Sequence, residues 1–401
     1  MPPALIVQKY GGTSIATVDR IQQVARYIRS TIQPTTQVVV VVSAMGSFTD
    51  EWVEAATHLH PDPPRREMDM LLTAGERMTA ALLAMALEKE GLHAISFTGS
   101  QIGILTDATH GNAKIHRILG DRIRKSLESH RIIVVAGFQG VDPQTKEVTT
   151  LGRGGSDLTA VALAATLQAD RCEIYKDVEG IYTADPRIIP EAQPISHLSW
   201  EAACALSGSG AQVLHDRAAN MACKYEIPIY IRSSLAPTQP GTLIEGHRTT
   251  METPHFIAIT NKKDQVYLDL LLTLSPNTAS IQPLYEWLCS RGDTPLVWNL
   301  RKKGLQLELQ HTLSKSNDKD YLAFLSTYCQ RVTTISILPL HILSLVGIGF
   351  SQSHTLLNTL STLLGDDLLS LEIQQGVIQI GVKPGAAAND LNKKLHAAFL
   401  G

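Results

Sequence analysis

Short apolar runs alternate with longer amphipathic stretches through the first part of the chain. Runs that are apolar at nearly every position predict strands buried on both faces, whereas apolar residues at every third or fourth position predict helices. The expected strands are 4–7, 37–42, 94–97, 132–136, 173–175 and 228–232. The expected helices include 18–28, 158–167, 200–207 and a long one from Met68. This alternation predicts an α/β fold, with a mostly parallel sheet sandwiched by helices.

The pattern changes beyond a segment rich in proline, glycine and threonine, which we interpret as a linker at 247–254. The strands expected after it are 256–260, 266–272, 305–311, 342–346 and 377–382, and the expected helices are 281–290, 320–330, 356–364 and 389–399. Two βαββα-like passages in series predict two small α+β modules. We therefore divide the chain into a larger domain at 1–246, the linker, and modules at 255–334 and 335–401.

The composition is that of an ordinary globular protein. Its 401 residues are 44% hydrophobic and 18% charged, and the net charge of -3 gives no basic excess that would indicate a nucleic-acid partner. The five cysteines have no metal-binding spacing, which favours buried thiols in a reducing compartment. The amino terminus lacks signal-peptide features, and the longest apolar run, 38–42, is too short to span a bilayer. We expect a cytoplasmic protein that engages neither nucleic acid nor membrane.

A glycine-rich turn precedes the apolar helix expected at 158–167. Glycines at 152, 154 and 155 surround Arg153, so the backbone can bend tightly and bring its N–H groups close to an anion. Ser156 and Asp157 follow at the expected helix N-cap. Because a helix dipole places positive potential at its N-terminus, this turn predicts an anion-binding site.

The segment EIYKDVEGIYTADPR predicts a short buried strand followed by a loop rich in Asp, Gly and Pro. Asp177 and Asp185 offer carboxylates for a metal, and Tyr182 offers an aromatic face for a base. Arg187 offers a guanidinium for phosphate. A nucleoside triphosphate site would use all of these groups.

A second candidate phosphate site follows the first expected strand, in the run Lys9-Tyr10-Gly11-Gly12. Lys9 can reach phosphate oxygens, while Gly11 and Gly12 let backbone amides approach them. The alternative is an ordinary βα turn with an exposed lysine, and this run alone does not decide between the two.

Other polar residues stand where a ligand would meet the sheet or its helices. Thr49 and two nearby serines follow the second expected strand, and they are either hydrogen-bond donors to a substrate or helix N-caps. Glu76 and Arg77 interrupt an otherwise apolar helix, so either they form a structural ion pair or Glu76 faces a cationic ligand group. His215 is expected to pack or to cap a helix.

Six ordered motifs resemble the successive signatures of aspartate kinases, which have the amino acid kinase fold. The motifs are KYGGTS at Lys9, VVSAMGSFTDE ending at Glu51, MDMLLTAGERM containing Glu76, GFQGVD at Gly137, TLGRGGSDLTAVALAA and DVEGIYTADPR. The resemblance covers nearly all of 4–245. It implies phosphorylation of the β-carboxylate of L-aspartate by ATP with Mg²⁺, giving 4-phospho-L-aspartate, the entry to lysine, methionine and threonine biosynthesis.

The resemblance also implies roles for individual residues. Lys9, Arg153 and Asp157 would be catalytic: Lys9 would neutralise the β- and γ-phosphates, Arg153 would clamp a substrate carboxylate, and Asp157 would orient Lys9. Mg²⁺ would bridge the phosphates and be held mainly by them. The residues expected to contact aspartate are Thr49, Glu76, Arg153 and Ser156, with Glu76 the partner of its α-ammonium group. The residues expected to contact the nucleotide are Lys9, Tyr10, Gly11, Gly12, Lys176, Asp177, Tyr182 and Arg187.

Two positions depart from the family pattern. Lys176 stands where many relatives have a small hydroxyl residue, and Gln212 stands where they have an adenine-side lysine. The C-terminal modules resemble ACT modules, which bind amino-acid effectors and pair between subunits, so a homodimer or higher homo-oligomer is expected. Their effector-binding stretches, 275–278 and 371–376, also differ from the family, and both amino-acid sensing and a purely structural role stay open.

Three alternatives to an aspartate kinase remain. The chain could be a non-catalytic amino-acid-binding regulatory subunit on the same fold, or a kinase of the same superfamily that acts on another acid. Glu76, Arg153 and Asp157 could also form one structural ion network in a protein that binds without catalysing.

Overall fold

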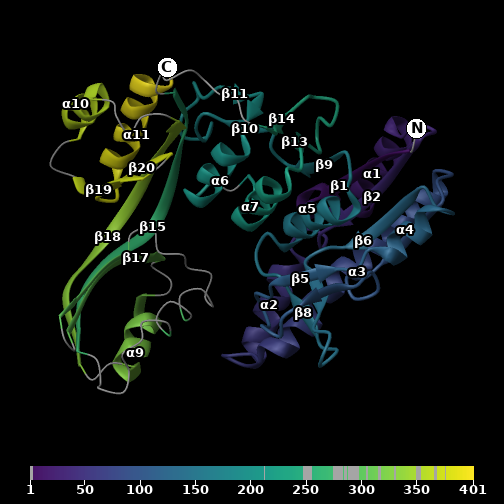
Figure 1. Cartoon of the computed structure of the whole chain (residues 1–401), viewed down its shortest axis with the longest axis horizontal. Coiled ribbons are helices and arrows are strands. Elements are labelled where there is room, and N and C mark those ends of the chain that lie inside the picture. Colours follow the sequence, from purple (N-terminus) through teal and green to yellow (C-terminus); the bar gives the residue numbers. More distant parts are fainter. Residues whose placement is uncertain are drawn as a thin grey trace. The chain divides into compact units, whose positions relative to one another are not determined.

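The computed structural model describes residues 3–211, 213–246, 255–273, 283, 287, 298–303, 306–314, 318–328, 331–348, 354–364, 368–374 and 376–401. These residues form two compact units (Figure 1). The first comprises the described residues of Met1–Ile181, Pro194–Ser207 and Gln212–Thr249. The second comprises those of Tyr182–Gln193, Gly208–Ala211 and Thr250–Gly401.

The first unit is built on an eight-stranded sheet. Its strand order is β12 (His197–Leu198), β14 (Thr242–Ile244), β13 (Ile229–Ser233), β9 (Arg171–Lys176), β1 (Ala4–Tyr10), β2 (Thr36–Val42), β6 (Ile132–Ala136) and β3 (Ala94–Phe97). Neighbouring strands are parallel except β13 and β14. The predicted mostly parallel sheet is thus confirmed, with β1 in its interior.

Helices cover both faces of this sheet. α1 (Val18–Thr31) and α3 (Arg65–Lys89) share one core with alternate residues of β2, such as Val40. α5 (Gly155–Leu167) packs against β1, β2 and β9 from the opposite face and against α7 (Asp216–Tyr225). The Ala, Val and Leu residues of α5 occupy all sides of the helix, which explains why almost every residue of it is buried. By length and composition alone α3 could cross a bilayer, but here it is a core helix.

The other helices of this unit include three that were not predicted. They are α2 (Phe48–Leu59), α4 (Asp121–Leu127), α6 (Trp200–Gly208) and the 3₁₀ helix η1 (Gly12–Ile15). The unpredicted helices are α2, α4 and η1; α4 and η1 are short, and no residue of α2 is buried. The long helix expected from Met68 begins slightly earlier, because α3 starts at Arg65.

A second, smaller sheet was also missed. Its order is β5 (Ile115–Ile118), β4 (Ile104–Thr106), β7 (Gln139–Val141) and β8 (Val148–Thr150). Strands of three or four residues are too short to establish a period of two in the sequence. Two shorter strands, β10 (Ile181–Tyr182) and β11 (Pro194–Ile195), flank the segment 182–193.

The second unit contains a six-stranded antiparallel sheet. Its order is β16 (Trp298–Lys303), β17 (Gln306–Ser314), β15 (His255–Thr273), β18 (Arg331–Ile348), β20 (Val377–Val382) and β19 (Leu368–Gln374). One core lies under α9 (Asp318–Tyr328) and another under α10 (His354–Leu363) and α11 (Ala386–Phe399). These helices lie toward opposite ends of the long strands β15 and β18 (Figure 1).

The two C-terminal modules share these long strands. The strands expected at 256–260 and 266–272 are one strand, β15, whose pairing with β18 shifts register at three places. β18 runs without a break through the expected boundary at 334 and 335, so that division stays a prediction, with the two separate cores in its favour. The linker expected at 247–254 lies outside the described residues, as does nearly all of the helix expected at 281–290.

Two short segments expected in the larger domain pack with the second unit instead. The Ile259 N–H donates to the Thr183 carbonyl at 2.7 Å, and the Thr260 hydroxyl donates to the Ser209 carbonyl at 2.7 Å. Thr183 Oγ1 also lies 3.1 Å from His396 Nε2 of α11. These contacts explain why 182–193 and 208–211 group with the second unit and not with residues 1–181.

Candidate functional site

Two lysines and one aspartate meet at the carboxyl ends of the central strands. Lys9 Nζ lies 2.7 Å from Asp157 Oδ1, and Lys176 Nζ lies 3.0 Å from Asp157 Oδ2. In the pairing of β1 with β9, Lys9 stands opposite Ile174, so Lys176 is two residues farther along and faces the same side of the sheet. That side is covered by α5, whose first turn supplies Asp157.

This cluster is buried and carries more positive than negative charge. The side chains of Lys9, Lys176 and Asp157 are 8%, 18% and 4% exposed. Burial alone would raise the pKa of Asp157, but the two ammonium groups lower it to about 2, so the carboxylate is ionised at neutral pH. Burial lowers the pKa of Lys176, an effect that the Asp157 carboxylate opposes. Two cations around one anion favour a further anion as ligand.

Glycines allow this close approach of backbone and ammonium. A Cβ at Gly11 would lie 3.4 Å from Lys9 Nζ, and one at Gly12 would lie 2.9 Å from the Ala44 carbonyl oxygen. The Gly11 N–H already donates to the Tyr175 carbonyl at 3.3 Å. The sequence-based expectation that the Gly11 amide binds phosphate therefore does not fit this geometry, because the amide has an acceptor within the sheet.

Glu76 is a buried carboxylate with one oxygen unsatisfied. Its Oε1 accepts a hydrogen bond from the Ala44 N–H at 3.0 Å, whereas Oε2 has no partner among the residues that the structure describes. Burial raises the pKa of Glu76 to about 7, although the Ala44 bond and the nearby charge of Lys9 act in the opposite direction. Arg77 donates to Gln139 Oε1 at 3.2 Å, so the ion pair between Glu76 and Arg77 is not formed. The unsatisfied oxygen fits a cationic ligand group.

The turn that carries Arg153 is held tightly on both sides. Gly152 has φ +78°, and a Cβ there would lie 2.9 Å from Asn112 Oδ1. Gly154 has φ +66°, and a Cβ there would lie 2.3 Å from Cγ of His215. Gly154 is also the N-cap of α5, which corrects the expectation that Ser156 and Asp157 cap this helix: both lie in its first turn. A left-handed backbone explains why glycine occupies the cap.

Arg153 itself is exposed, and among the described residues its guanidinium takes part in no ion pair or hydrogen bond. It immediately precedes the N-terminus of α5, and therefore lies at the same end of this helix as Asp157 and its partner Lys9. Ser156 is 7% exposed, and its Oγ would lie 2.9 Å from a Cβ at Gly137. Among the described residues neither Arg153 nor Asp157 is paired with Glu76, so the geometry does not contain a structural network of Glu76, Arg153 and Asp157.

Several other predicted site residues are half-buried or exposed, or belong to the second unit. Thr49 is half-buried in the first turn of α2. Asp177 is exposed immediately after β9. Tyr182 and Arg187 belong to the second unit. There Arg187 donates two hydrogen bonds to Asp185, from Nε to Oδ1 at 3.0 Å and from Nη2 to Oδ2 at 2.8 Å. The contact of Tyr182 and Arg187 with a nucleotide stays a prediction, and Gln212 lies outside the described residues.

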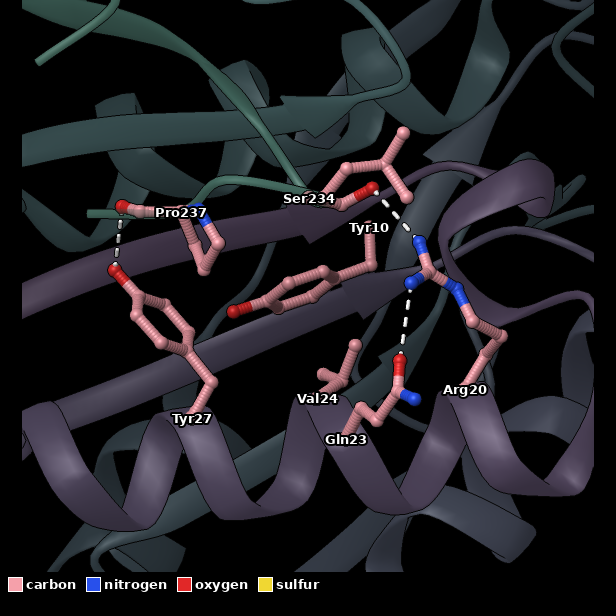
Figure 2. Close-up of a pocket in the computed structure, with 8 residues that line it drawn as sticks. Tyr10, Arg20, Gln23, Val24, Tyr27, Ser234 and Pro237 are labelled. Carbon is pink, nitrogen blue, oxygen red and sulfur yellow. Dashed lines mark hydrogen bonds between the residues drawn. The ribbon is translucent and has the colours of Figure 1, made fainter. Parts of the chain in front are cut away.

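The Tyr10 side chain lies on the other face of the sheet from Lys9. Its ring is 1% exposed and stacks on Tyr175, with the centroids 4.7 Å apart and the planes 6° apart. It lines a pocket of about 180 Å³ against α1. In Figure 2 the Tyr10 ring lies over α1, with Tyr27 and Arg20 on either side. Neighbouring residues of a strand point to opposite faces, so the predicted nucleotide contact of Tyr10 is limited to its backbone.

A second buried acid of α3, Asp69, was missed in the sequence. Asp69 is 1% exposed; its Oδ2 lies 2.7 Å from His110 Nδ1, and its Oδ1 accepts from the Gly111 N–H at 3.1 Å and from the Thr150 hydroxyl. Asp69 thus anchors the loop that touches the Gly152 turn through Asn112. The available signal was its spacing of seven residues from Glu76, which places both acids on one face of α3.

Helix α7 supports the same turn. The Arg217 guanidinium donates to the Leu151 carbonyl at 2.6 Å and to the Ala113 carbonyl at 2.8 Å, and so ties the two loops together. His215 is the N-cap of α7, and its Nδ1 accepts from the Arg217 N–H at 3.4 Å, which confirms the predicted capping role. In the described part of the chain no group of three or more His, Cys, Asp or Glu side chains could hold a metal ion.

Comparison with known proteins shows the family to which the chain belongs. The sequence model of the amino acid kinase family matches residues 4–233. An aspartokinase of Mycolicibacterium smegmatis is 54% identical over 243 residues, which are 61% of this chain and 58% of that protein. An aspartokinase of Geobacillus stearothermophilus is 45% identical over 288 residues, 72% of this chain and 70% of that protein. The chain thus spans less than two thirds of the length of the first of these relatives.

The fold is also that of a solved structure. Escherichia coli aspartokinase III in complex with aspartate and ADP, in its R-state, superposes with a TM-score of 0.78, and the match covers 99% of this chain and all of that one. At 23% sequence identity this similarity concerns the fold. The superposed region includes both the large, mostly parallel sheet and the C-terminal antiparallel sheet.

Proposed function

The chain belongs to the amino acid kinase family, and we propose that it transfers the γ-phosphoryl group of ATP to the β-carboxylate of L-aspartate, giving 4-phospho-L-aspartate and ADP. The reaction is the entry to lysine, methionine and threonine biosynthesis, and we place it in the cytoplasm. The relatives named aspartokinase support the reaction, and the charges gathered at the carboxyl ends of β1 and β9 support the site.

The observation that carries this proposal is the unsatisfied oxygen of Glu76. A buried carboxylate without a full set of partners is costly, unless a ligand completes it. The α-ammonium group of an amino acid is such a ligand, and the half-buried Thr49 and exposed Arg153 would hold its carboxylates. An amino-acid substrate therefore explains why an acid sits beside the cationic cluster of Lys9 and Lys176.

The chemistry asks little of the protein beyond position and charge. A carboxylate is ionised at neutral pH and attacks phosphorus without a general base, so the enzyme must hold two anions in line. Lys9 would offset the charge of the transferring phosphoryl group, and Asp157 would hold the Lys9 ammonium in place. Ser156, next to Asp157 in the first turn of α5, would complete the aspartate side of the site.

ATP is a fitting partner for this site because the cluster around Asp157 has an excess of positive charge. Mg²⁺ would enter with the nucleotide, held mainly by phosphate oxygens, and would add charge neutralisation there. The exposed Asp177, directly after Lys176, is the nearest carboxylate in sequence that could meet such a complex.

A hydroxamate assay of the purified chain tests the reaction. With MgATP and L-aspartate we expect aspartyl hydroxamate to accumulate, whereas L-glutamate should give none, because its longer side chain displaces the γ-carboxylate from the phosphoryl group. Product with glutamate alone would favour a kinase of another acid. Absence of product with both acids, together with measurable aspartate binding, would favour a non-catalytic amino-acid-binding subunit.

We further propose that the protein is a homodimer or higher homo-oligomer, formed through the second unit. β19 is an edge strand of the described sheet and exposes Leu371 and Ile373, which are 40% and 43% exposed. An apolar edge strand favours pairing with another strand. Light scattering should give the mass of an oligomer, and Leu371→Asp should shift it toward the monomer.

The ACT-like modules leave two roles for the second unit, amino-acid sensing and assembly alone. Titration calorimetry with lysine, threonine and methionine separates them. Heat with any one of the three supports sensing, and no heat with all three supports a structural role.

A further inference from the structure

The sequence resemblance assigns Lys176 a contact with the nucleotide but no catalytic role. Lys176 lies at the end of β9, and its ammonium is 3.0 Å from one oxygen of Asp157, while the Lys9 ammonium is 2.7 Å from the other. A single carboxylate therefore lies between two ammonium groups. A hydroxyl residue at position 176 would leave Lys9 and Asp157 as a neutral pair.

Burial makes this second positive charge significant. The Lys176 side chain is 18% exposed, and the Asp157 carboxylate is already shared with Lys9. Of the other acids close in sequence or space, Asp177 is exposed and Glu76 keeps a free oxygen for a cation. A buried ammonium whose carboxylate partner is shared with a second ammonium is costly in the unliganded protein, and a polyanionic ligand offsets that cost.

Strand geometry directs this charge toward the same ligand that Lys9 would bind. Lys9 pairs with Ile174, so the backbone of Lys176 lies about 7 Å beyond that of Lys9 along the strand direction. Both side chains nevertheless turn to Asp157 at the N-terminus of α5. The two ammonium groups thus lie on either side of one carboxylate, at the end of the sheet where the phosphates would be held.

We propose that Lys176 is a second catalytic lysine, whose ammonium contacts the γ-phosphoryl group during transfer, on the opposite side of Asp157 from Lys9. This inference rests on the proposed function. In the reaction, an oxygen of the substrate β-carboxylate forms a bond to the γ-phosphorus, and the bond to the oxygen that bridges the β- and γ-phosphates breaks. The electron pair leaves with ADP and no proton moves, so both lysines act through charge alone.

The test compares Lys176→Met with Lys176→Arg, and uses Lys125→Met as a control for the loss of one exposed lysine of the same unit. We expect Lys176→Met to lower kcat by about a hundredfold while KM for aspartate changes less than about threefold. Lys176→Arg should recover part of this loss because it restores the charge. Lys125→Met should behave as the unsubstituted protein.

Nucleotide binding gives a readout that does not depend on turnover. By calorimetry with Mg²⁺, Lys176→Met should weaken binding of a non-hydrolysable ATP analogue at least about tenfold and binding of ADP less than about threefold. A purely structural lysine would instead weaken both nucleotides equally or lower the melting temperature. The melting temperature of Lys176→Met should not fall, because Lys9 still pairs with Asp157.

The outcomes separate this inference from the proposed function. If the unsubstituted chain makes no aspartyl hydroxamate, the proposed function fails first. If that chain is active and Lys176→Met keeps its kcat, or loses affinity for ADP as much as for the ATP analogue, the role of Lys176 is overturned. Should Lys176→Met fail to fold, Lys176→Gln carries the same comparison with a polar, uncharged side chain.

Discussion

The ammonium of Lys9 lies 2.7 Å from the carboxylate of Asp157, and both side chains are almost fully buried. An ion pair at this depth contributes little net stability, because desolvation of the two charges offsets their attraction. What the pair supplies is position: Asp157, fixed in the first turn of α5, determines where the end of the Lys9 side chain lies. The cationic site is therefore assembled before any ligand arrives, and its residues can be tested one at a time.

Lys9→Met should lower kcat/KM for aspartate by at least about a hundredfold, which corresponds to about 2.7 kcal/mol of transition-state binding. The loss follows because the phosphoryl group would keep only the charge of Lys176 beside it. Steady-state hydroxamate assays measure the effect. Lys89→Met, in the last turn of α3, removes an exposed lysine as a control. Equal activity of the Lys9 variant and this control would exclude Lys9 from the mechanism.

Arg153→Lys should lower kcat/KM for aspartate by at least about a hundredfold without changing the melting temperature. A lysine keeps the charge but cannot form two parallel hydrogen bonds to a carboxylate. No stability is lost because, among the described residues, Arg153 takes part in no ion pair or hydrogen bond. Arg29→Lys, at the exposed end of α1, is the matched control. A fall in melting temperature with unchanged kinetics would show instead that Arg153 is structural.

Much of this site could be anticipated from local sequence. The glycines around Arg153 and after Lys9 predicted tight turns at strand and helix ends, and these turns do bring Lys9 and Asp157 together. The interruption of an apolar helix by Glu76 predicted a buried acid, because a charge in such a position needs a partner. These predictions succeeded since each depends on one segment and on the general arrangement of an α/β sheet.

The rest depends on contacts between distant segments. Whether Lys176 reaches Asp157 is decided by the register of β9 against β1 and by the position of α5. The link from Asp69 to His110 joins a helix to a loop with no local motif in either. The Tyr10 side chain could have been placed correctly, since alternation along β1 puts it opposite Lys9. Its inclusion in a glycine-rich motif obscured that simpler rule.

The kcat/KM for aspartate should fall as the pH drops below about 7, the value to which burial raises the pKa of Glu76. The ionised carboxylate binds the α-ammonium group and the protonated form does not, so the fall should approach about tenfold per pH unit and level off above neutrality. Assays from about pH 5.5 to about pH 9 at saturating ATP record this profile. Glu76→Gln should lower activity throughout and remove the inflection. An inflection that survives in Glu76→Gln would assign it to another group.

Gly154→Ala should reduce both stability and activity. The new Cβ would lie 2.3 Å from Cγ of His215, and φ of +66° is strained for alanine by about 1 to 2 kcal/mol. The turn must shift, and Arg153 shifts with it. Gly91→Ala isolates the backbone strain, because Gly91 also has positive φ, at +77°, but nothing lies within 4 Å of its Cβ position. Thermal melting and kcat/KM should both fall further for Gly154→Ala, and equal values for the two variants would contradict the packing argument.

Asp69→Asn should raise KM for aspartate about tenfold while changing kcat less. The buried carboxylate accepts from the Gly111 N–H and from the Thr150 hydroxyl at Oδ1 and contacts His110 at Oδ2, and an amide has an acceptor oxygen at only one of these two positions. The loop it anchors touches the Gly152 turn, so the effect should reach Arg153 and through it the grip on the substrate carboxylate.

Asp142→Asn is the control for this prediction, because Asp142 is also buried and organises a turn by accepting from Gln144 and Thr145. Both variants should melt at lower temperature than the unsubstituted chain, since each removes hydrogen bonds to a buried carboxylate. Only Asp69→Asn should change KM, because only its loop touches the turn that carries Arg153. A similar rise in KM for both variants would attribute the effect to general loosening of the fold and remove the positioning role of Asp69.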